Sequence, residues 1–195
     1  MNSIFFSLVL FLSGSSPNFL ANHPVAHGKA NPGETEFKLY NEINWADSKP
    51  DFVVFNDAVL GFRRLQDSLS LFKKPLLTII DFSKPSNDQR LWVINMETKR
   101  LLIHSLVAHG RNSGELMAAH FSNKINSLQS SLGFYRTGVA YQGKHGLSLK
   151  LHGLEKGIND QAEKRAIVIH GAEYVSEIFV KRNGRLGRSQ GCPGR

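Results

Sequence analysis

The spacing of apolar residues changes along the chain, and the change separates a helical segment from a β-rich remainder. Between residues 51 and 72, apolar positions recur mostly every three or four residues, which predicts one amphipathic helix packed on a core. These positions are Phe52, Val53, Phe55, Ala58, Val59, Phe62, Leu65 and Leu69. We therefore expect one long helix before the first strand of the domain.

Short apolar and β-branched runs, separated by turn residues, fill the rest of the chain and predict strands. We expect strands at residues 76–81, 91–95, 100–108, 137–143, 147–153 and 166–170. The second and third flank METK as a hairpin, and the fourth and fifth flank KHG as another. Segment 173–181 fits either a strand or a helix. The pattern predicts a mainly β fold, of the β-rich α+β class, preceded by the N-terminal amphipathic helix.

The first 50 residues are expected to lie outside the domain. Residues 4–12, IFFSLVLFL, form an apolar run that is too short to cross a bilayer as a helix and is typical of a signal-peptide core. We expect residues 1–21 to be a signal peptide that directs export to the periplasm or cell envelope; the alternative is a hydrophobic helix that stays attached. Residues 22–50 are rich in Asn, Pro, Gly, His and Lys, and are expected to form a linker or arm. No later run is apolar enough for a transmembrane helix, so we expect no stable membrane insertion.

Composition and charge limit the partners. A chain of 195 residues with 41% hydrophobic content can build one domain with a core and is short for two. Its net charge of +8 attracts anions, although a solvated basic surface is the simplest interpretation. The sequence has no zinc-finger spacing and no clear RNA-binding motif, so we do not expect nucleic acid as the partner. An anionic polymer such as a bacterial cell wall fits the charge equally well.

Cys192 is the only cysteine, and it lies three residues before the last residue. One cysteine excludes an internal disulfide and a zinc site with several thiolates. It leaves a buried spectator thiol, an intermolecular bridge or a nucleophile. The reactive form of a thiol is the thiolate, and a histidine within reach is the usual means of deprotonation.

Three of the eight histidines, His109, His145 and His170, are followed by glycine and close or adjoin a predicted strand. A side chain at the end of a strand is firmly held. His170 is the best candidate for a base because its strand is apolar enough to be central and only a short segment separates it from Cys192. The three histidines are also enough ligands for the zinc ion of a hydrolase. Against this alternative, the sequence has no HExxH helix and no obvious acidic partner.

The loop around the cysteine carries further signals. In SQGC, the N–H groups of Gln190, Gly191 and Cys192 can converge on one point, since glycine allows the positive φ that such a nest requires. This arrangement would make an oxyanion hole. Arg185 and Arg188 can lower the pKa of the thiol, hold a substrate carboxylate, or merely solvate the loop.

The sequence around these residues resembles a known family. IHG at 169–171, followed by GRSQGC at 187–192, resembles the YkuD-type L,D-transpeptidase catalytic domain. Five further stretches, in the same order, are similar to the branch of murein L,D-transpeptidase catalytic domain proteins. They are IIDFSKPSNDQRLWVIN, LVAHGRNSG, SSLGFY, GKHGLSLKLHGLE and RAIVIHGAEYVS. The likeness covers residues 50 to 193.

The resemblance implies a fold and a reaction. The fold would be the mainly β, sandwich-like catalytic domain, here residues 51–195. Cys192 would be the nucleophile, His170 its general base and then acid, and the Gly171 carbonyl would orient the His170 ring. The amides of Gly191 and Cys192 would form the oxyanion hole. This transferase would take an acyl group from a peptidoglycan stem peptide and pass it to an amine or to water, with no metal or organic cofactor.

The resemblance leaves two questions open. His109, Ser113, His145 and Arg188 are candidates for substrate binding, with the alternative that they serve only their own loops. Domains of the family continue well beyond the cysteine, so residues 51–195 are expected to be a domain truncated at its C-terminus. The alternative to an exported cysteine acyltransferase is therefore an inactive truncated homologue that acts as a non-catalytic peptidoglycan-binding or interaction module.

Overall fold

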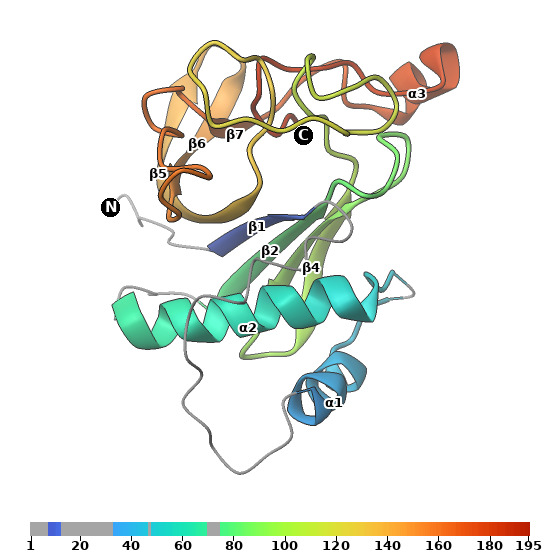
Figure 1. Ribbon diagram of the computed structural model, residues 1–195. Coiled ribbons are helices and arrows are strands. Elements are labelled where there is room, and N and C mark those ends of the chain that lie inside the picture. Colours follow the sequence, from blue (N-terminus) through green and yellow to red (C-terminus); the bar gives the residue numbers. More distant parts are fainter. Residues whose placement is uncertain (1–7, 13–32, 47, 70–74) are drawn as a thin grey trace.

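The computed structural model describes residues 8–12, 33–46, 48–69 and 75–195, which build one seven-stranded sheet with helices against it (Figure 1). The strands are β1 (Leu8–Leu12), β2 (Leu76–Asp81), β3 (Leu91–Asn95), β4 (Arg100–Ser105), β5 (Gly133–Gly143), β6 (Gly146–Gly153) and β7 (Val168–His170). The helices are α1 (Glu34–Glu42), α2 (Phe52–Leu69) and α3 (Glu177–Asn183). Within these residues, none of the helices has the length and apolarity to cross a membrane. The β-rich α+β class predicted from the sequence is confirmed.

The two predicted hairpins form the two halves of the sheet. The strand order is β4-β3-β2-β1-β5-β6-β7, with β3 and β4 joined by the METK turn and β5 and β6 by the turn at Lys144 and His145. The last expected strand, β7, pairs antiparallel with β6 and ends on His170. The ambiguous segment 173–181 becomes helical from Glu177, as α3. The hairpins therefore bring the histidine at the end of β7 to one edge of the sheet.

The strand β1 connects the two halves. It runs parallel to β2, with Leu8 opposite Leu77, and antiparallel to β5, with Leu10 opposite Phe134. The same residues were expected to be the core of a signal peptide. The presence of residues 8–12 in a strand does not decide whether the chain is cleaved, so the signal peptide stays a prediction. However, cleavage after residue 21 would remove the strand that lies between β2 and β5.

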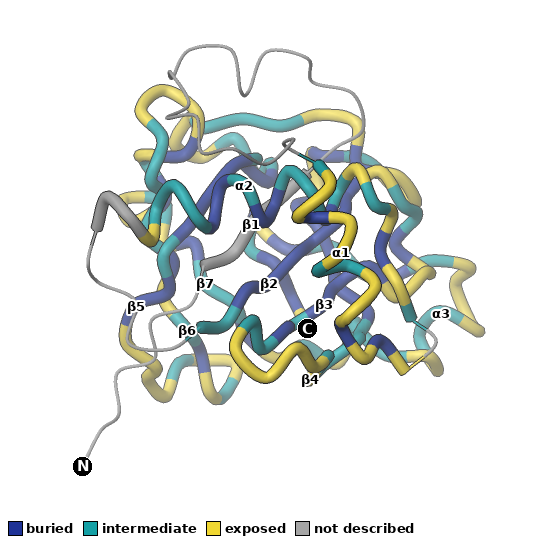
Figure 2. The backbone as a smooth tube through the Cα atoms, turned by 90° about the horizontal axis from the view of Figure 1, so that it is seen from below, coloured by how far each residue is buried: buried dark blue, intermediate teal, exposed yellow. Residues whose placement is uncertain are grey.

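Alternate residues of the sheet point into two separate cores. Leu77 and Ile79 of β2 belong to the cluster that α2 covers, whereas Ile80 belongs to the cluster on the opposite face. Phe134 and Tyr135 of β5 divide between the two cores in the same way. A period of two is the property of a strand buried on both faces, and Figure 2 shows the buried backbone along β2 and α2. Of these two clusters, the second is the one against which Cys192 packs, so the cysteine lies on the face of the sheet away from α2.

The predicted amphipathic helix is α2. Its fully buried side chains, Phe55, Ala58, Val59 and Phe62, recur at the expected three- and four-residue spacing. Gly61 allows the helix to lie close to the sheet, because a Cβ on it would lie 1.8 Å from Cζ of Phe134. This close packing holds α2 against one face of the sheet.

The prediction that residues 22–50 form a linker or arm is wrong for its second half. Residues 34–42 form α1, and Ile43 and Trp45 lie in the core beneath α2. The Glu36 carboxylate accepts a hydrogen bond from the Gly33 N–H at 2.9 Å and pairs with Arg63 of α2. This cap and this ion pair join segments that are distant in sequence, so the composition of residues 22–50 gave no signal of them.

Deletion of residues 1–21 tests the role of β1. Without this strand, β2 and β5 lose the backbone partner between them, so we expect a melting temperature lower by more than about 5 °C than that of the full chain. Deletion of residues 1–7, which keeps β1, is the control and is expected to melt with the full chain. Equal melting of both shortened chains in circular dichroism would show that the sheet does not depend on β1.

Glu155 predicts a pH dependence of stability. Its carboxylate accepts a hydrogen bond from the Phe134 N–H at 2.6 Å, and burial raises the pKa of this group to about 7 from an ordinary 4.5. The folded protein therefore holds the proton more tightly, and the free energy of unfolding falls as pH rises through this window. Glu155→Gln keeps a hydrogen-bond acceptor and buries no charge. We expect its melting temperature to be about 2–4 °C above that of the wild type at pH 8 and equal to that of the wild type at pH 4. Equal melting at pH 8 would contradict this.

Candidate functional site

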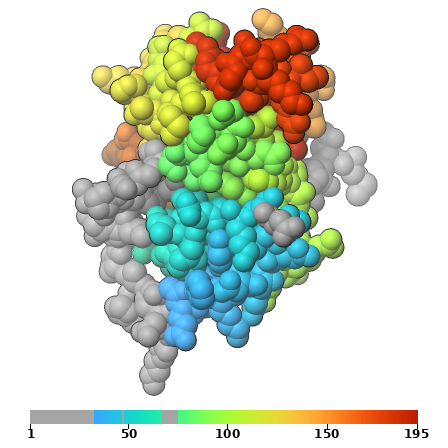
Figure 3. Space-filling model, turned by 90° about the vertical axis from the view of Figure 1, so that its right-hand side faces the viewer, coloured from blue at the N-terminus to red at the C-terminus, as the bar shows by residue number. Residues whose placement is uncertain are grey.

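The chain around the cysteine lies between β7 and the segment that follows β4. Ala108 donates its N–H to the Gly194 carbonyl at 2.8 Å, and Arg195 donates to the His170 carbonyl at 2.8 Å. Further along, the Arg111 N–H donates to the Ser189 carbonyl at 2.8 Å. In Figure 3 the C-terminal residues (red) lie directly against the loop that carries residues 106–130 (yellow-green). These contacts hold the cysteine loop as an extra, irregular strand beside β7.

The thiol of Cys192 is partly buried against the second core cluster. Its Sγ donates to the Ala166 carbonyl at 3.6 Å, just before β7. Burial raises the pKa of the thiol, while the Val168 N–H and the charge of Arg165 act in the opposite direction. The balance is a raised pKa, so the resting sulfur is a protonated thiol at neutral pH and needs a base to become a nucleophile.

His170 is held in a defined orientation at the end of β7. Its side chain is 7% exposed, and its Nδ1 lies 2.7 Å from the Gly171 carbonyl oxygen. A carbonyl oxygen can only accept a hydrogen bond, so Nδ1 carries the proton in the neutral ring and Nε2 is left with its lone pair. This is the contact that the family resemblance implied for Gly171. It leaves Nε2 as the nitrogen that can take a proton.

His145 lies over the ring of His170. It comes from the turn between β5 and β6, is exposed, and stacks on His170 with ring centroids 5.0 Å apart and an interplanar angle of 29°. The β6–β7 pairing explains this position, because Ser148, three residues after His145, lies opposite His170. His145 therefore forms a solvent-facing wall over the buried histidine.

Arg165 supplies the positive charge beside the cysteine loop. One of its terminal nitrogens donates to the Ser122 carbonyl and to the Ser131 hydroxyl, and the other donates to the Gln129 carbonyl. A Cβ on Gly191 would lie 3.1 Å from Nη2 of Arg165. The half-buried guanidinium thus ties the 122–131 loop to the residue before the cysteine, and its charge favours the thiolate.

The amides expected to form an oxyanion hole are partly engaged. Gly191 has the positive φ expected of a nest, at 119°. Its N–H donates to the Ser189 hydroxyl at 3.0 Å, and that hydroxyl donates to the Cys192 carbonyl at 2.5 Å. A substrate oxyanion would have to replace the Ser189 oxygen at this amide. The oxyanion role of Gly191 and Cys192 stays a prediction.

Two of the candidate substrate residues are fully buried. The ring of His109 accepts a hydrogen bond from Arg90 at Nδ1, at 2.8 Å, and donates one from Nε2 to the Gly114 carbonyl at 3.1 Å. Burial, and then the charge of Arg90, lower the pKa of His109 to about 4, so the ring is neutral. Ser113 accepts the Ser130 N–H at 2.9 Å. Both side chains order the loops around the site, and either could meet a substrate only if these loops opened.

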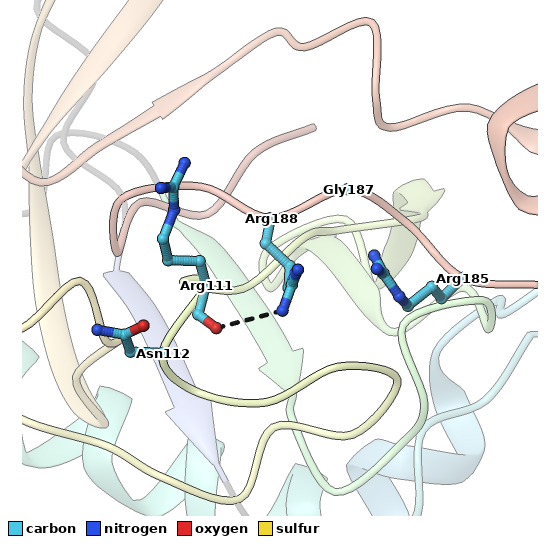
Figure 4. A pocket seen from close by; sticks show the side chains of 5 residues that line it. All are labelled: Arg111, Asn112, Arg185, Gly187 and Arg188. Atoms are coloured by element: carbon cyan, nitrogen blue, oxygen red, sulfur yellow. Dashed lines mark hydrogen bonds between the residues drawn. The ribbon is translucent and has the colours of Figure 1, made fainter. Parts of the chain in front are cut away.

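Arg185 and Arg188 are not the charges that lower the pKa of the Cys192 thiol, since Arg165 is the cation that has this effect. Both pair with the carboxylate of Glu115. Together with Arg111, Asn112 and Gly187 they line an open pocket of about 350 Å³ (Figure 4). Of the three sequence interpretations for these arginines, an anion site is therefore the one their positions favour.

The zinc alternative finds no ligand set in the described part of the chain. No three His, Cys, Asp or Glu side chains there are placed to hold a metal ion. His145 and His170 are together, but both ring nitrogens of His109 are already used by Arg90 and Gly114. These three histidines therefore do not form a common zinc site.

Sequence reasoning missed the roles of Arg165 and Glu115. Arg165 is the first residue of the RAIVIHGAEYVS stretch but was given no role of its own, and Glu115 lies in a loop without periodicity. Tyr174 is a third neighbour of the site: a Cβ on Gly187 would lie 2.5 Å from its Cβ, and burial, and then the charge of Cys192, raise the pKa of its hydroxyl. No spacing in the sequence signals these contacts, because each partner comes from another loop.

The role of Arg165 is tested by the pH dependence of alkylation. Arg165→Gln removes the cation beside the thiolate, so we expect the pKa of Cys192 to rise further and alkylation by iodoacetamide to need a higher pH. Arg165→Lys keeps the charge and is the matched control, expected to stay near the wild type. Because Cys192 is the only cysteine, the rate reports one group. A midpoint in Arg165→Gln that is unchanged or lower would contradict the assignment.

Comparison with known proteins agrees with this geometry. The chain matches the L,D-transpeptidase catalytic domain family over residues 46–194, which is more than half of its length. Neither the search of curated proteins nor that of solved structures gave a match. The match spans the two hairpins, β7 and the cysteine loop, and it confirms the family predicted from the residues. The chain belongs to the L,D-transpeptidase catalytic domain family.

Proposed function

We propose that this protein is a cysteine acyltransferase that acts on peptidoglycan stem peptides, with Cys192 as nucleophile and His170 as general base. Family membership supports a peptidoglycan-related, transpeptidase-like activity. The observation that carries the finer assignment is the orientation of His170. Its Nδ1 is held by the Gly171 carbonyl at 2.7 Å on the strand that the cysteine loop lines, which leaves Nε2 for the proton of the thiol.

The first half-reaction forms a thioester. His170 Nε2 takes the proton of Cys192 as the sulfur attacks the carbonyl carbon between the L-centre of the diamino acid and the terminal D-alanine. The carbonyl oxygen becomes an oxyanion, which the amides of the SQGC loop stabilise. When the intermediate collapses, the C–N bond breaks and the imidazolium gives its proton to the leaving amine, so D-alanine departs and the acyl group stays on sulfur.

The second half-reaction returns the free thiol. An amine of another stem, or water, attacks the thioester carbon while His170 takes its proton. The C–S bond then breaks and the sulfur recovers a proton from the imidazolium. An amine acceptor gives a cross-link, and water gives an L,D-carboxypeptidase. The thiol must cycle between both protonation states, which a thiol whose pKa is raised by burial can do only with the help of a base.

The location of the substrate makes export part of the proposal. A peptidoglycan-directed enzyme works in the cell envelope, and the apolar run at residues 4–12 is the segment that would direct it there. The strand β1 uses residues 8–12 of that run. Intact-mass measurement of the protein recovered from the envelope distinguishes a chain that keeps these residues from one cleaved near residue 21.

Two observations favour a second function. The Gly191 amide already donates to Ser189, and the thiol has a raised pKa, so the site as it stands is at rest. The same fold could bind stem peptides without turning them over. Covalent chemistry at Cys192 separates the two functions.

Acylation by a carbapenem tests the nucleophile and the base. We expect a mass adduct on Cys192 in the wild type, none in Cys192→Ala, and a rate about 10²–10⁴-fold lower in His170→Gln, which has no comparable base. His120→Gln, at an exposed histidine of a loop, is the control and should react like the wild type. An adduct at the wild-type rate in His170→Gln would remove the base assignment. No adduct in a folded wild type would favour the binding module.

A further inference from the structure

Two arginines near the cysteine loop hold one carboxylate between them. Arg185 Nη2 lies 3.0 Å from Glu115 Oε2, and Arg188 pairs with the other oxygen, Glu115 Oε1. Each oxygen of the carboxylate thus has its own guanidinium. Guanidinium groups on both oxygens are a strong and geometrically selective way to hold a carboxylate.

The site of this carboxylate is open to solvent and lies on the segment of chain that precedes the cysteine. Arg185 and Arg188 line the pocket of about 350 Å³, with Gly187 between them (Figure 4). In the same view the side chain of Arg111 points away from this pair, and its carbonyl accepts a hydrogen bond from Arg188 at 3.5 Å. Cys192 follows Arg188 by four residues.

Glu115 is the movable member of the cluster. Its side chain is 65% exposed, whereas those of Arg185 and Arg188 are 30% and 26% exposed. Exposed ion pairs contribute little to stability, so a competing carboxylate can displace this one at small cost. Two arginines face this single carboxylate, which leaves an excess of positive charge for an anionic ligand.

We propose that Arg185 and Arg188 bind a carboxylate of the peptide substrate, and that Glu115 occupies their site in the free protein as an internal competitor. The identity of the substrate as a stem peptide rests on the proposed function. The consequence is a selectivity for stem peptides with free carboxylates over peptides in which these groups are amidated. A further consequence is that removal of the Glu115 charge makes binding tighter.

Calorimetric binding of two peptides tests the proposal. The ligands are a stem tetrapeptide and its counterpart with every carboxyl group converted to a carboxamide, and all proteins carry Cys192→Ala so that nothing is turned over. We expect Glu115→Gln to bind the acidic peptide about three- to tenfold more tightly and the amidated peptide with unchanged affinity. Adding Arg185→Gln to Glu115→Gln should cancel the gain.

The control is Glu97→Gln, which removes one negative charge at the exposed turn between β3 and β4, at the end of that hairpin opposite the 106–111 segment. It should change neither affinity more than about twofold. An unchanged affinity of Glu115→Gln for the acidic peptide, an equal gain for both peptides, or no binding of either would overturn the proposal. Carbapenem acylation of the protein that keeps Cys192 tests the proposed function separately. If the binding test fails, an adduct on Cys192 would leave the acyltransferase proposal standing, and the absence of an adduct would show that both proposals fail.

Discussion

The hydrogen bonds that insert residues 189–195 between the 108–111 segment and β7 are the constraint on which the site depends. They place Cys192 beside the strand of His170, and they bring the chain from the arginine pocket directly into the nucleophile loop. The fit is tight, because a Cβ on Gly110 would lie 2.5 Å from the Leu128 carbonyl oxygen and 2.9 Å from the Gly191 Cα. Three loops meet at this glycine. Any side chain there would separate them.

The charges around the site follow from this packing. Burial of the thiol against the second core raises its pKa, and Arg165, fixed by acceptors of the 122–131 loop, limits the rise. Arg185 and Arg188 face the other way, toward Glu115 and solvent. The positive charges thus have different roles: Arg165 lowers the pKa of the thiol, and Arg185 and Arg188 are available to an anionic ligand. A protonated resting thiol requires a base in the proposed reaction, which is why the His170 tautomer matters.

Much of the fold could be predicted because its signals are local. The stripe of Phe55, Ala58, Val59 and Phe62 has helical spacing, and each hairpin has its turn between two apolar runs. The helix α1 was missed since its stabilising partner, Arg63, lies in another helix. The place of β1 in the sheet was not foreseen either, because an apolar run has the same appearance in a leader and in a central strand.

The site was predictable where its residues are neighbours in sequence. His170 and Gly171 form one contact and could be named from the IHG motif, whereas Arg165 meets its partners across 34 to 43 residues. His109 and Ser113 were candidates for substrate binding, with the alternative that they serve only their own loops. Their hydrogen bonds with Arg90 and Ser130 satisfy them inside the protein instead. Polarity alone does not indicate exposure where loops pack on one another.

The central claim is that Cys192 carries the acyl group after His170 has taken its proton. Rapid quenching of the protein with a stem tetrapeptide, followed by intact-mass spectrometry, tests this claim most directly. The account predicts a species heavier by the mass of the tetrapeptide minus that of D-alanine, which is lost on treatment with hydroxylamine and maps to Cys192. Release of D-alanine by Cys192→Ala protein, at the rate of the wild type, would contradict it.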